Sequence, residues 1–105
     1  MREPDGLALS SRNVYLGPED RREAVGLCEA LGAARSRWLD GVRQPDGIEA
    51  AMRERLTRRP GIAVDYIAIV DDERFQPVDQ VSERTIAAVA GRVGPTRLID
   101  NILIP

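Results

Sequence analysis

The sequence predicts a single α+β domain over residues 1–105, with two helices packed on one face of a small, mainly antiparallel sheet of three or four strands. Apolar residues recur at helical spacing in the first half of the chain, whereas β-branched residues concentrate in the second half. The gaps between the expected strands are too short for crossover helices, so neighbouring strands should run antiparallel. The length is near the commonest domain size, which suits one hydrophobic core.

The first helix is expected over residues 18–39. Pro18 suits the first helical position, and the acidic pair Glu19-Asp20 favours the positive end of the helix dipole. Asp40-Gly41 then ends the helix. Its apolar positions recur at helical spacing: Ala24, Leu27, Cys28, Leu31 and Trp38.

Four residues within this helix carry further expectations. Gly26 and Gly32 each cost about 0.5–1 kcal/mol relative to alanine, so the helix is either closely packed at these positions or locally weak. Cys28 is expected to be a small buried apolar residue rather than a nucleophile. Trp38 is expected to be a core or rim residue rather than a stacking platform.

A second helix is expected over residues 46–58, ending before Pro60-Gly61. Charged residues surround one apolar face, which consists of Ile48, Ala51, Met52 and Leu56. At the end of this helix, Arg58-Arg59 is expected to complement the helix dipole rather than to form a basic patch.

Three segments of the second half are expected to be strands. Ile62–Val70 is apolar on most of both faces, and further strands are expected over Thr85–Val93 and Arg97–Ile104. The intervening Gly94-Pro95-Thr96 is typical of a tight turn. A polar segment over Phe75–Val81 contains a proline, so it is expected to be an edge strand or a loop.

Two groups of charged residues favour structural roles. Asp71-Asp72-Glu73 could in principle hold magnesium, but consecutive turn residues point in different directions, so a turn is expected. Arg97 and Asp100 are expected to pair with one another or with neighbours and so to hold the last strand.

Composition excludes several classes of function. The net charge is −2 and all fifteen basic residues are arginines scattered along the chain, which disfavours nucleic-acid binding. No stretch approaches the roughly 18 apolar residues of a membrane span, and the chain start does not match a signal peptide. A single cysteine permits no internal disulfide and fits a reducing cytoplasm. Without histidine or lysine there is no imidazole base, Cys/His zinc set or Schiff-base amine, and no metal ligands are expected.

The segment Asp5–Asn13 carries the strongest chemical signal. Ser10 and Ser11 each offer an O–H donor, and Arg12 offers five N–H donors in a planar fork that suits phosphate oxygens. These side chains precede the first helix and could face one ligand as a phosphate clamp. The alternative is an ordinary solvated loop. Because only carboxylates remain as bases, such a clamp would be half of a site completed elsewhere.

The residues around this segment resemble the start of the C-terminal domain of the pantothenate synthetase (pantoate–beta-alanine ligase) family. The resemblance covers Arg2–Leu16 nearly residue for residue. It continues along the chain with Asp65-Tyr66-Ile67 and Thr96–Asn101 as later landmarks in the same order. Three separated matches are much more specific than any single motif.

The resemblance implies one part of an ATP-dependent, AMP-forming ligase. Family members adenylate the pantoate carboxylate and release pyrophosphate, and the amine of beta-alanine then attacks the pantoyl-adenylate to give pantothenate and AMP. The N-terminal Rossmann-like domain, with the pantoate pocket and a phosphate-binding lysine, is expected to be missing from this chain. The C-terminal domain is a hinged lid over ATP, so this fragment alone is expected to be inactive. The full-length enzyme is expected to be a cytoplasmic homodimer.

Carried over by position, the ATP-contacting stretch of the family falls on Leu9, Ser10, Ser11 and Arg12, with the last three in the catalytic role. Leu9 replaces the usual methionine, which is a volume-conserving change. Met1 falls on a position where the family commonly has a valine whose backbone contacts the adenine. Magnesium would be bound mainly through the nucleotide.

Two alternatives to this interpretation differ in class. The chain could be a non-enzymatic module that senses a small anion or contacts another subunit. It could also be the lid of another nucleotidyl-transferring ligase, although the later match at Arg97–Asn101 argues against that. The response of Ser10–Asn13 to MgATP, compared with sulfate, would distinguish an ATP lid from an anion sensor.

Overall fold

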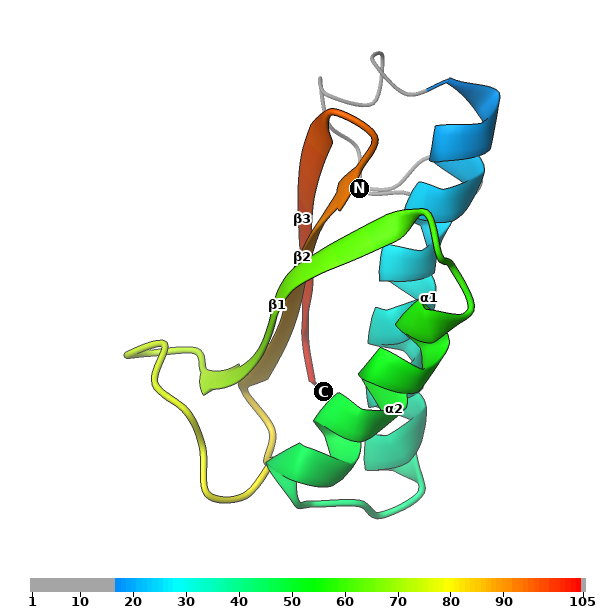
Figure 1. The fold of residues 1–105 in the computed structure, drawn as a ribbon. Coiled ribbons are helices and arrows are strands. Elements are labelled where there is room, and N and C mark those ends of the chain that lie inside the picture. Colours follow the sequence, from blue (N-terminus) through cyan, green and yellow to red (C-terminus); the bar gives the residue numbers. More distant parts are fainter. Residues whose placement is uncertain (1–16, 105) are drawn as a thin grey trace.

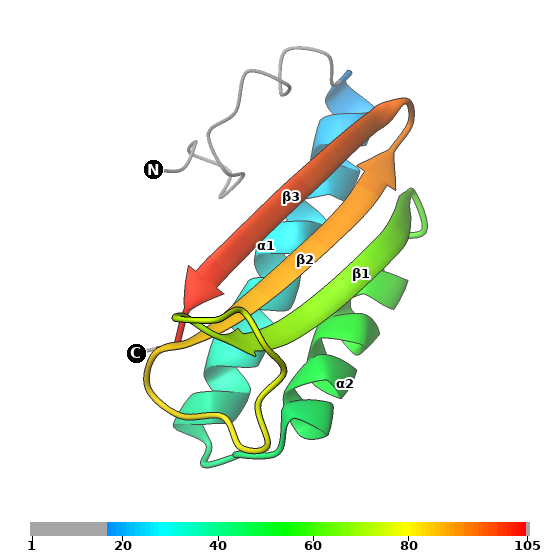
Figure 2. The ribbon, with the colours of Figure 1, turned by 90° about the vertical axis from the view of Figure 1, so that its left-hand side faces the viewer.

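The computed structural model describes residues 17–104 as two helices and a three-stranded sheet. In sequence order the elements are α1 (Pro18–Leu39), α2 (Pro45–Thr57), β1 (Ile62–Asp71), β2 (Thr85–Val93) and β3 (Thr96–Leu103). Both helices lie on one side of the sheet (Figure 1), and Figure 2 shows the sheet from the opposite side. The expected α+β fold, with an antiparallel sheet covered on one face by helices, is confirmed.

Local residues set both ends of α1, which has the predicted bounds. Gly17 is extended (φ −70°, ψ 171°), and Pro18 supplies the fixed φ of the first turn. Beyond the other end, Gly41 adopts a φ of +98°, a left-handed conformation that glycine reaches without steric cost.

α2 matches the prediction to within one residue at each end. It begins at Pro45 because proline again takes the first helical position, as it does in α1. It ends at Thr57, with Arg58 as the capping residue. In this last turn the Thr57 hydroxyl donates a 2.6 Å hydrogen bond to the carbonyl of Glu54.

The strands are ordered β1-β2-β3, and each neighbouring pair is antiparallel. β3 begins one residue before the expected position because Thr96 pairs with Val93 across the turn. That leaves Gly94 and Pro95 as the turn residues, with Gly94 at a φ of +58°. The tight turn predicted here is therefore confirmed, and it is one residue shorter than the predicted gap.

The segment Phe75–Val81 is a loop rather than a fourth strand of the described chain. It makes an isolated bridge between Val70 and Pro77, at the end of β1. Proline has no backbone N–H to extend a ladder, which explains why pairing stops there.

The core lies between the helices and the inward-facing side chains of the sheet. Alanines on α1 allow its backbone to approach the strands closely, while larger side chains fill the remaining space. The core cluster consists of Ala24, Leu27, Ala30, Leu31, Ala34, Ile48, Met52, Leu56, Ile62, Ile69, Val81, Ala87, Val89, Val93, Leu98 and Ile104.

Two residues of α1 lie beside this core rather than in it. Trp38 is partly buried against the core, and the guanidinium of Arg43 lies 3.6 Å from its ring centroid, so the rim position expected for it is confirmed. The expectation that Cys28 is buried is wrong: it is partly exposed and outside the core cluster. It follows Leu27, which points into the core, and a helix turns by about 100° per residue.

The two glycines inside α1 have different environments. A Cβ atom on Gly26 would lie 2.6 Å from Cγ of Arg59 and 2.8 Å from Cδ1 of Ile62. A Cβ atom on Gly32 would meet nothing within 4 Å. Close packing therefore explains Gly26, whereas Gly32 is a position of local helix weakness.

Replacing each glycine with alanine should change stability in opposite directions. Gly32→Ala should raise the free energy of unfolding by about 0.5–1 kcal/mol, because alanine restricts the unfolded chain and suits a helix. Gly26→Ala should lower it by about 1–3 kcal/mol, because the new methyl group overpacks the contact with Ile62. Urea unfolding followed by circular dichroism measures both, and a stabilised Gly26→Ala protein would contradict the packing argument.

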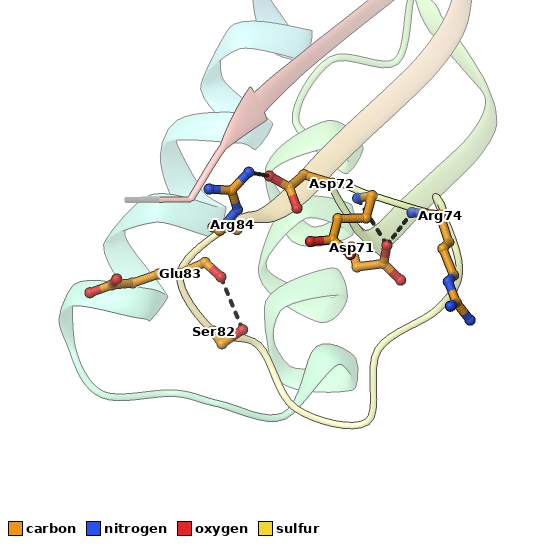
Figure 3. Close-up of polar contacts among 7 residues, drawn as sticks. Asp71, Asp72, Arg74, Ser82, Glu83 and Arg84 are labelled. Atoms are coloured by element: carbon orange, nitrogen blue, oxygen red, sulfur yellow. Dashed lines mark hydrogen bonds and ion pairs between the residues drawn. The ribbon is translucent and has the colours of Figure 1, made fainter.

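The Asp71 carboxylate organises the turn that follows β1 (Figure 3). Its Oδ1 accepts hydrogen bonds from the backbone N–H groups of Arg74 and, at 3.1 Å, of Glu73. These donors, that of Arg74 foremost, hold the pKa of Asp71 below its ordinary value of 3.8, against a smaller opposing effect of burial. The turn predicted for Asp71-Asp72-Glu73 is confirmed.

The other end of this loop closes on Arg84, whose φ of +71° is unusual for a residue with a side chain. Its guanidinium pairs with Asp72 at 2.8 Å, and this hydrogen bond and charge raise the pKa of Arg84 (Figure 3). Its backbone N–H donates to Ile104 at 3.2 Å, and its carbonyl accepts from the N–H of Asp72 at 3.1 Å. Together these contacts oppose a backbone strain of order 1–3 kcal/mol.

Acid should weaken the domain through Asp71. Because its folded-state pKa lies below the unfolded value, the ionised carboxylate contributes stability above about pH 4, and this is lost as the pH falls through the folded pKa. Asp71→Asn should therefore be less stable than the parent near neutral pH and less sensitive to acid. Urea unfolding of both proteins across this range tests the difference. A carboxyl NMR titration of Asp71 with a midpoint at or above 3.8 would refute it.

Candidate functional site

The residues that the sequence singles out for ATP contact lie outside the part of the chain that the structure describes. Met1, Leu9, Ser10, Ser11 and Arg12 all precede Gly17, where the description begins. Their roles therefore remain predictions. The described residues define the scaffold that follows this segment in the sequence and the polar groups on its surface.

Arg97 and Asp65 form an ion pair that spans the sheet. The Nε atom of Arg97, on β3, lies 2.8 Å from Oδ2 of Asp65, on β1, so the pair crosses over β2. Asp65 lies where the β1–β2 register shifts, between Val64 and Tyr66, and this irregularity leaves it outside the regular pairing. The prediction that Arg97 pairs with a neighbour and holds the last strand is confirmed.

Asp100 lies on the opposite face of the sheet from Arg97. It is three residues further along β3 and pairs with the core residue Val89, so its side chain is on the helix-covered face. Asp100 is only 8% exposed, and its Oδ1 accepts a 2.8 Å hydrogen bond from the N–H of Asn101. This buried carboxylate is a structural element of β3.

Two threonines are buried on the same face as Asp100, at the ends of strands. Thr85 begins β2, and its Oγ1 accepts a 3.0 Å hydrogen bond from the N–H of Ser82. The backbone carbonyl of Thr85 accepts a 2.7 Å bond from the N–H of Ile104. Thr96 begins β3 and is 8% exposed. Thr85 therefore has a structural role, because its hydroxyl and carbonyl bind the loop before β2 and the residue after β3.

The arginines at the end of α2 are held by glutamates. Arg58 pairs with Glu54 one helical turn earlier at 2.6 Å, and Arg59 pairs with Glu29 of α1 at 2.8 Å. The second pair is partly buried and joins the two helices. Both arginines are thus engaged in ion pairs with glutamates, and their predicted complementing of the helix dipole stays a prediction.

Within residues 17–104 the structure contains no group of three or more histidine, cysteine, aspartate or glutamate residues placed to hold a metal ion. The described helices also include none that is long and apolar enough to span a bilayer. At the end of β1, Asp71 and Asp72 act separately, since Asp71 accepts hydrogen bonds from backbone N–H groups and Asp72 pairs with Arg84.

Two surface hollows lie next to the helices. One, of about 400 Å³, lies between α1 and α2 and has a charged lining that includes Glu29, Arg37 and Arg55. The other, of about 480 Å³, lies between the start of α2, β1 and the following loop, and Asp46 and Asp79 are among its residues. The first hollow includes Ser36 beside carboxylates such as that of Asp40, but no hydrogen bond among the described residues joins the Ser36 hydroxyl to a carboxylate. Neither hollow therefore resembles a self-contained active site.

Sequence reasoning did not single out one surface feature, the exposed side of the sheet. Large apolar residues on it are strongly exposed: Tyr66 by 39%, Ile99 by 48% and Leu103 by 55%. The signal was present in β1, which is apolar on both faces although helices cover only one. A strand buried on a single face would alternate more cleanly.

Comparison with known proteins shows extensive similarity to one family. A family model described as pantoate-beta-alanine ligase matches residues 1–103. Among curated relatives, the pantothenate synthetase of Thermotoga petrophila is 45% identical over 104 residues, which are 99% of this chain and 37% of that protein. That of Rubrobacter xylanophilus is 47% identical over 106 residues, or 36% of its length.

Solved structures give the same result. The pantothenate synthetase of Thermus thermophilus superposes with a TM-score of 0.94 at 42% identity, covering 100% of this chain and 38% of that one. A pantoate-beta-alanine ligase of Francisella tularensis, solved with beta-gamma ATP and beta-alanine, has a TM-score of 0.58 at 24% identity, which supports the fold alone.

The match to the family model covers the candidate ATP-contacting segment and all five described elements. The curated relatives and the Thermus structure are ligases, and this chain spans little more than a third of their length. This chain belongs to the pantoate-beta-alanine ligase family.

Proposed function

We propose that this chain is the C-terminal domain of a pantothenate synthetase. It closes over ATP while pantoate is condensed with beta-alanine through a pantoyl-adenylate, giving pantothenate, AMP and pyrophosphate. The match of residues 1–103 to the family model carries the proposal, because it includes Ser10-Ser11-Arg12 as well as the folded scaffold. The relatives extend far beyond the matched region, so the acid and amine pockets are expected in the part that this chain does not span.

Three side chains are proposed to contact the triphosphate. Ser10 and Ser11 donate O–H bonds, and the Arg12 guanidinium donates N–H bonds to phosphate oxygens. Negative charge develops on the triphosphate as pyrophosphate leaves, and donors already aimed at these oxygens stabilise the transition state more than the ground state. Leu9 and Met1 are proposed to contact the nucleotide beside them. Magnesium would be held mainly by the phosphates.

Catalysis in this proposal rests on positioning. The chain contains neither histidine nor lysine, and a neutral amine of beta-alanine needs no base from it. The proposed catalytic segment precedes α1 in the sequence. The buried residues of α1 hold that helix against the sheet, so the domain can move as one rigid lid. A lid without the surface it closes on has no complete site, and this chain alone is proposed to be inactive. The complete enzyme is proposed to be a cytoplasmic homodimer.

A chimera tests the shared site. Replacing the matching segment of the Thermotoga petrophila synthetase with this chain should give a protein that forms AMP from ATP, pantoate and beta-alanine. This chain alone should form none, because the site would be incomplete. The measurement is AMP release, with circular dichroism confirming that both proteins are folded. AMP formation by the chain alone, or a folded but inactive chimera, would overturn the proposal.

Within that chimera, Arg12→Ala should lower the rate of adenylation by roughly 10²-fold, since it removes a charged donor from the developing pyrophosphate. Arg35→Ala is the matched control, because Arg35 is exposed on α1; it should change the rate by less than about twofold. Single-turnover measurement of pyrophosphate release separates adenylation from the later attack by the amine. Equal rates for the two variants would exclude a phosphate contact by Arg12.

A further inference from the structure

The sheet has one face that the described structure leaves uncovered, and we call its outward side chains the open face. Figure 2 shows this side of the sheet, with both helices behind it. The strand pairing shows which side chains point outward. Side chains alternate between the two faces along a strand, and residues paired with core positions point inward. The open face consists of Ala63, Tyr66, Ala68, Val70, Ile86, Ala88, Ala90, Arg92, Arg97, Ile99, Asn101 and Leu103.

The centre of the open face is apolar and ordered in rows. Tyr66, Ala90 and Ile99 are paired across the three strands, and so are Val70, Ile86 and Leu103. Between these two apolar rows lies a third, formed by Ala68, Ala88 and the polar Asn101. Ala90 is 0% exposed although both helices lie on the other face of the sheet. Such contiguous apolar surface, with large side chains half exposed, marks a contact site.

Charged groups border one end of the open face. The Arg97–Asp65 ion pair lies there, and Arg92 is exposed beside it, with no ion pair recorded among residues 17–104. An apolar centre with a charged border is the usual anatomy of a protein interface.

The size of the open face indicates what kind of partner covers it. Over the eight residues of β3, three strands spaced by about 4.8 Å and rising about 3.3 Å per residue have a footprint of roughly 380 Å². Separate proteins that form a stable complex bury about 800 Å² per partner, so two copies of this face would bind weakly. Domains of one chain meet over about 600–1,500 Å² in total, and their covalent link raises the effective concentration to about the millimolar range.

We propose that the open face docks on the part of the synthetase that relatives carry outside the region matched by this chain. The inference rests on the proposed function, because it takes the chain to be one domain of a longer enzyme. The relatives supply such a part, since the chain covers only 37% of the Thermotoga petrophila protein and 38% of the Thermus one. The covering surface is apolar opposite Tyr66, Ile99 and Leu103, and acidic opposite Arg92.

Cysteine labelling tests this placement without relying on activity. In a Cys28→Ser background, Ile99→Cys and Leu103→Cys place single thiols on the open face. Leu39→Cys is the matched control, since Leu39 is a comparably exposed leucine, at 69%, at the end of α1 on the other side of the molecule. The rate of maleimide labelling is measured for each thiol in this chain alone and in the Thermotoga chimera.

Both face thiols should react about tenfold or more slowly in the chimera than in the chain alone, because a docked thiol reacts only when the interface opens. The Leu39→Cys rate should be nearly the same in both proteins. Equal rates for the face thiols in a chimera that forms AMP would overturn the docking inference and leave the proposed function standing. Protection of the face thiols in a folded chimera that forms no AMP would support the docking inference and overturn the proposed function. Protection that appears in the chain alone and grows with its concentration would instead assign the face to a second copy.

Discussion

Packing of the α1 stripe onto the inward face of the sheet is the interaction on which the rest of this molecule depends. A three-stranded sheet has too little apolar surface to be stable alone, and α1 and α2 supply the second layer. Leu27 and Leu31 lie with Val89 and Val93 in one buried cluster, and Gly26 allows Arg59 and Ile62 to approach the helix closely. The Arg59–Glu29 pair then joins the two helices at the edge of this contact.

One-sided coverage has a direct consequence for function. Because both helices lie on one face, the other face of the sheet keeps half-exposed Tyr66, Ile99 and Leu103. The described domain thus has a well-packed core, but one face of its sheet exposes large apolar side chains. In its two described hollows no hydroxyl is hydrogen-bonded to a carboxylate base, and the chain contains no histidine or lysine. Both properties agree with the proposal that the part which the longer relatives carry outside the matched region covers this surface and completes the site.

In the proposed chemistry, the main requirement on the folded domain is that it hold the phosphate-binding side chains rigidly. Hydroxyl and guanidinium donors act on a phosphate only where they are held in position as charge develops. In the proposed function, a lid that carries such donors can be small and needs no catalytic base of its own. The Arg97–Asp65 ion pair and the contacts of Asp71 and Arg84 have a common role, which is to hold the strands and the loop in one arrangement.

The sequence by itself determined the elements and the family. Pro18, Pro45 and Gly94 set helix starts and a turn through fixed or permissive φ angles, so these bounds were predictable to within a residue. Tertiary structure decided what no local pattern encodes. It distinguished the packed Gly26 from the open Gly32, left Cys28 partly exposed although this residue fits the helical repeat, and joined Arg97 to Asp65 across an intervening strand. It also decided which face of the apolar β1 is covered, because that depends on where the helices pack and not on the strand's own residues.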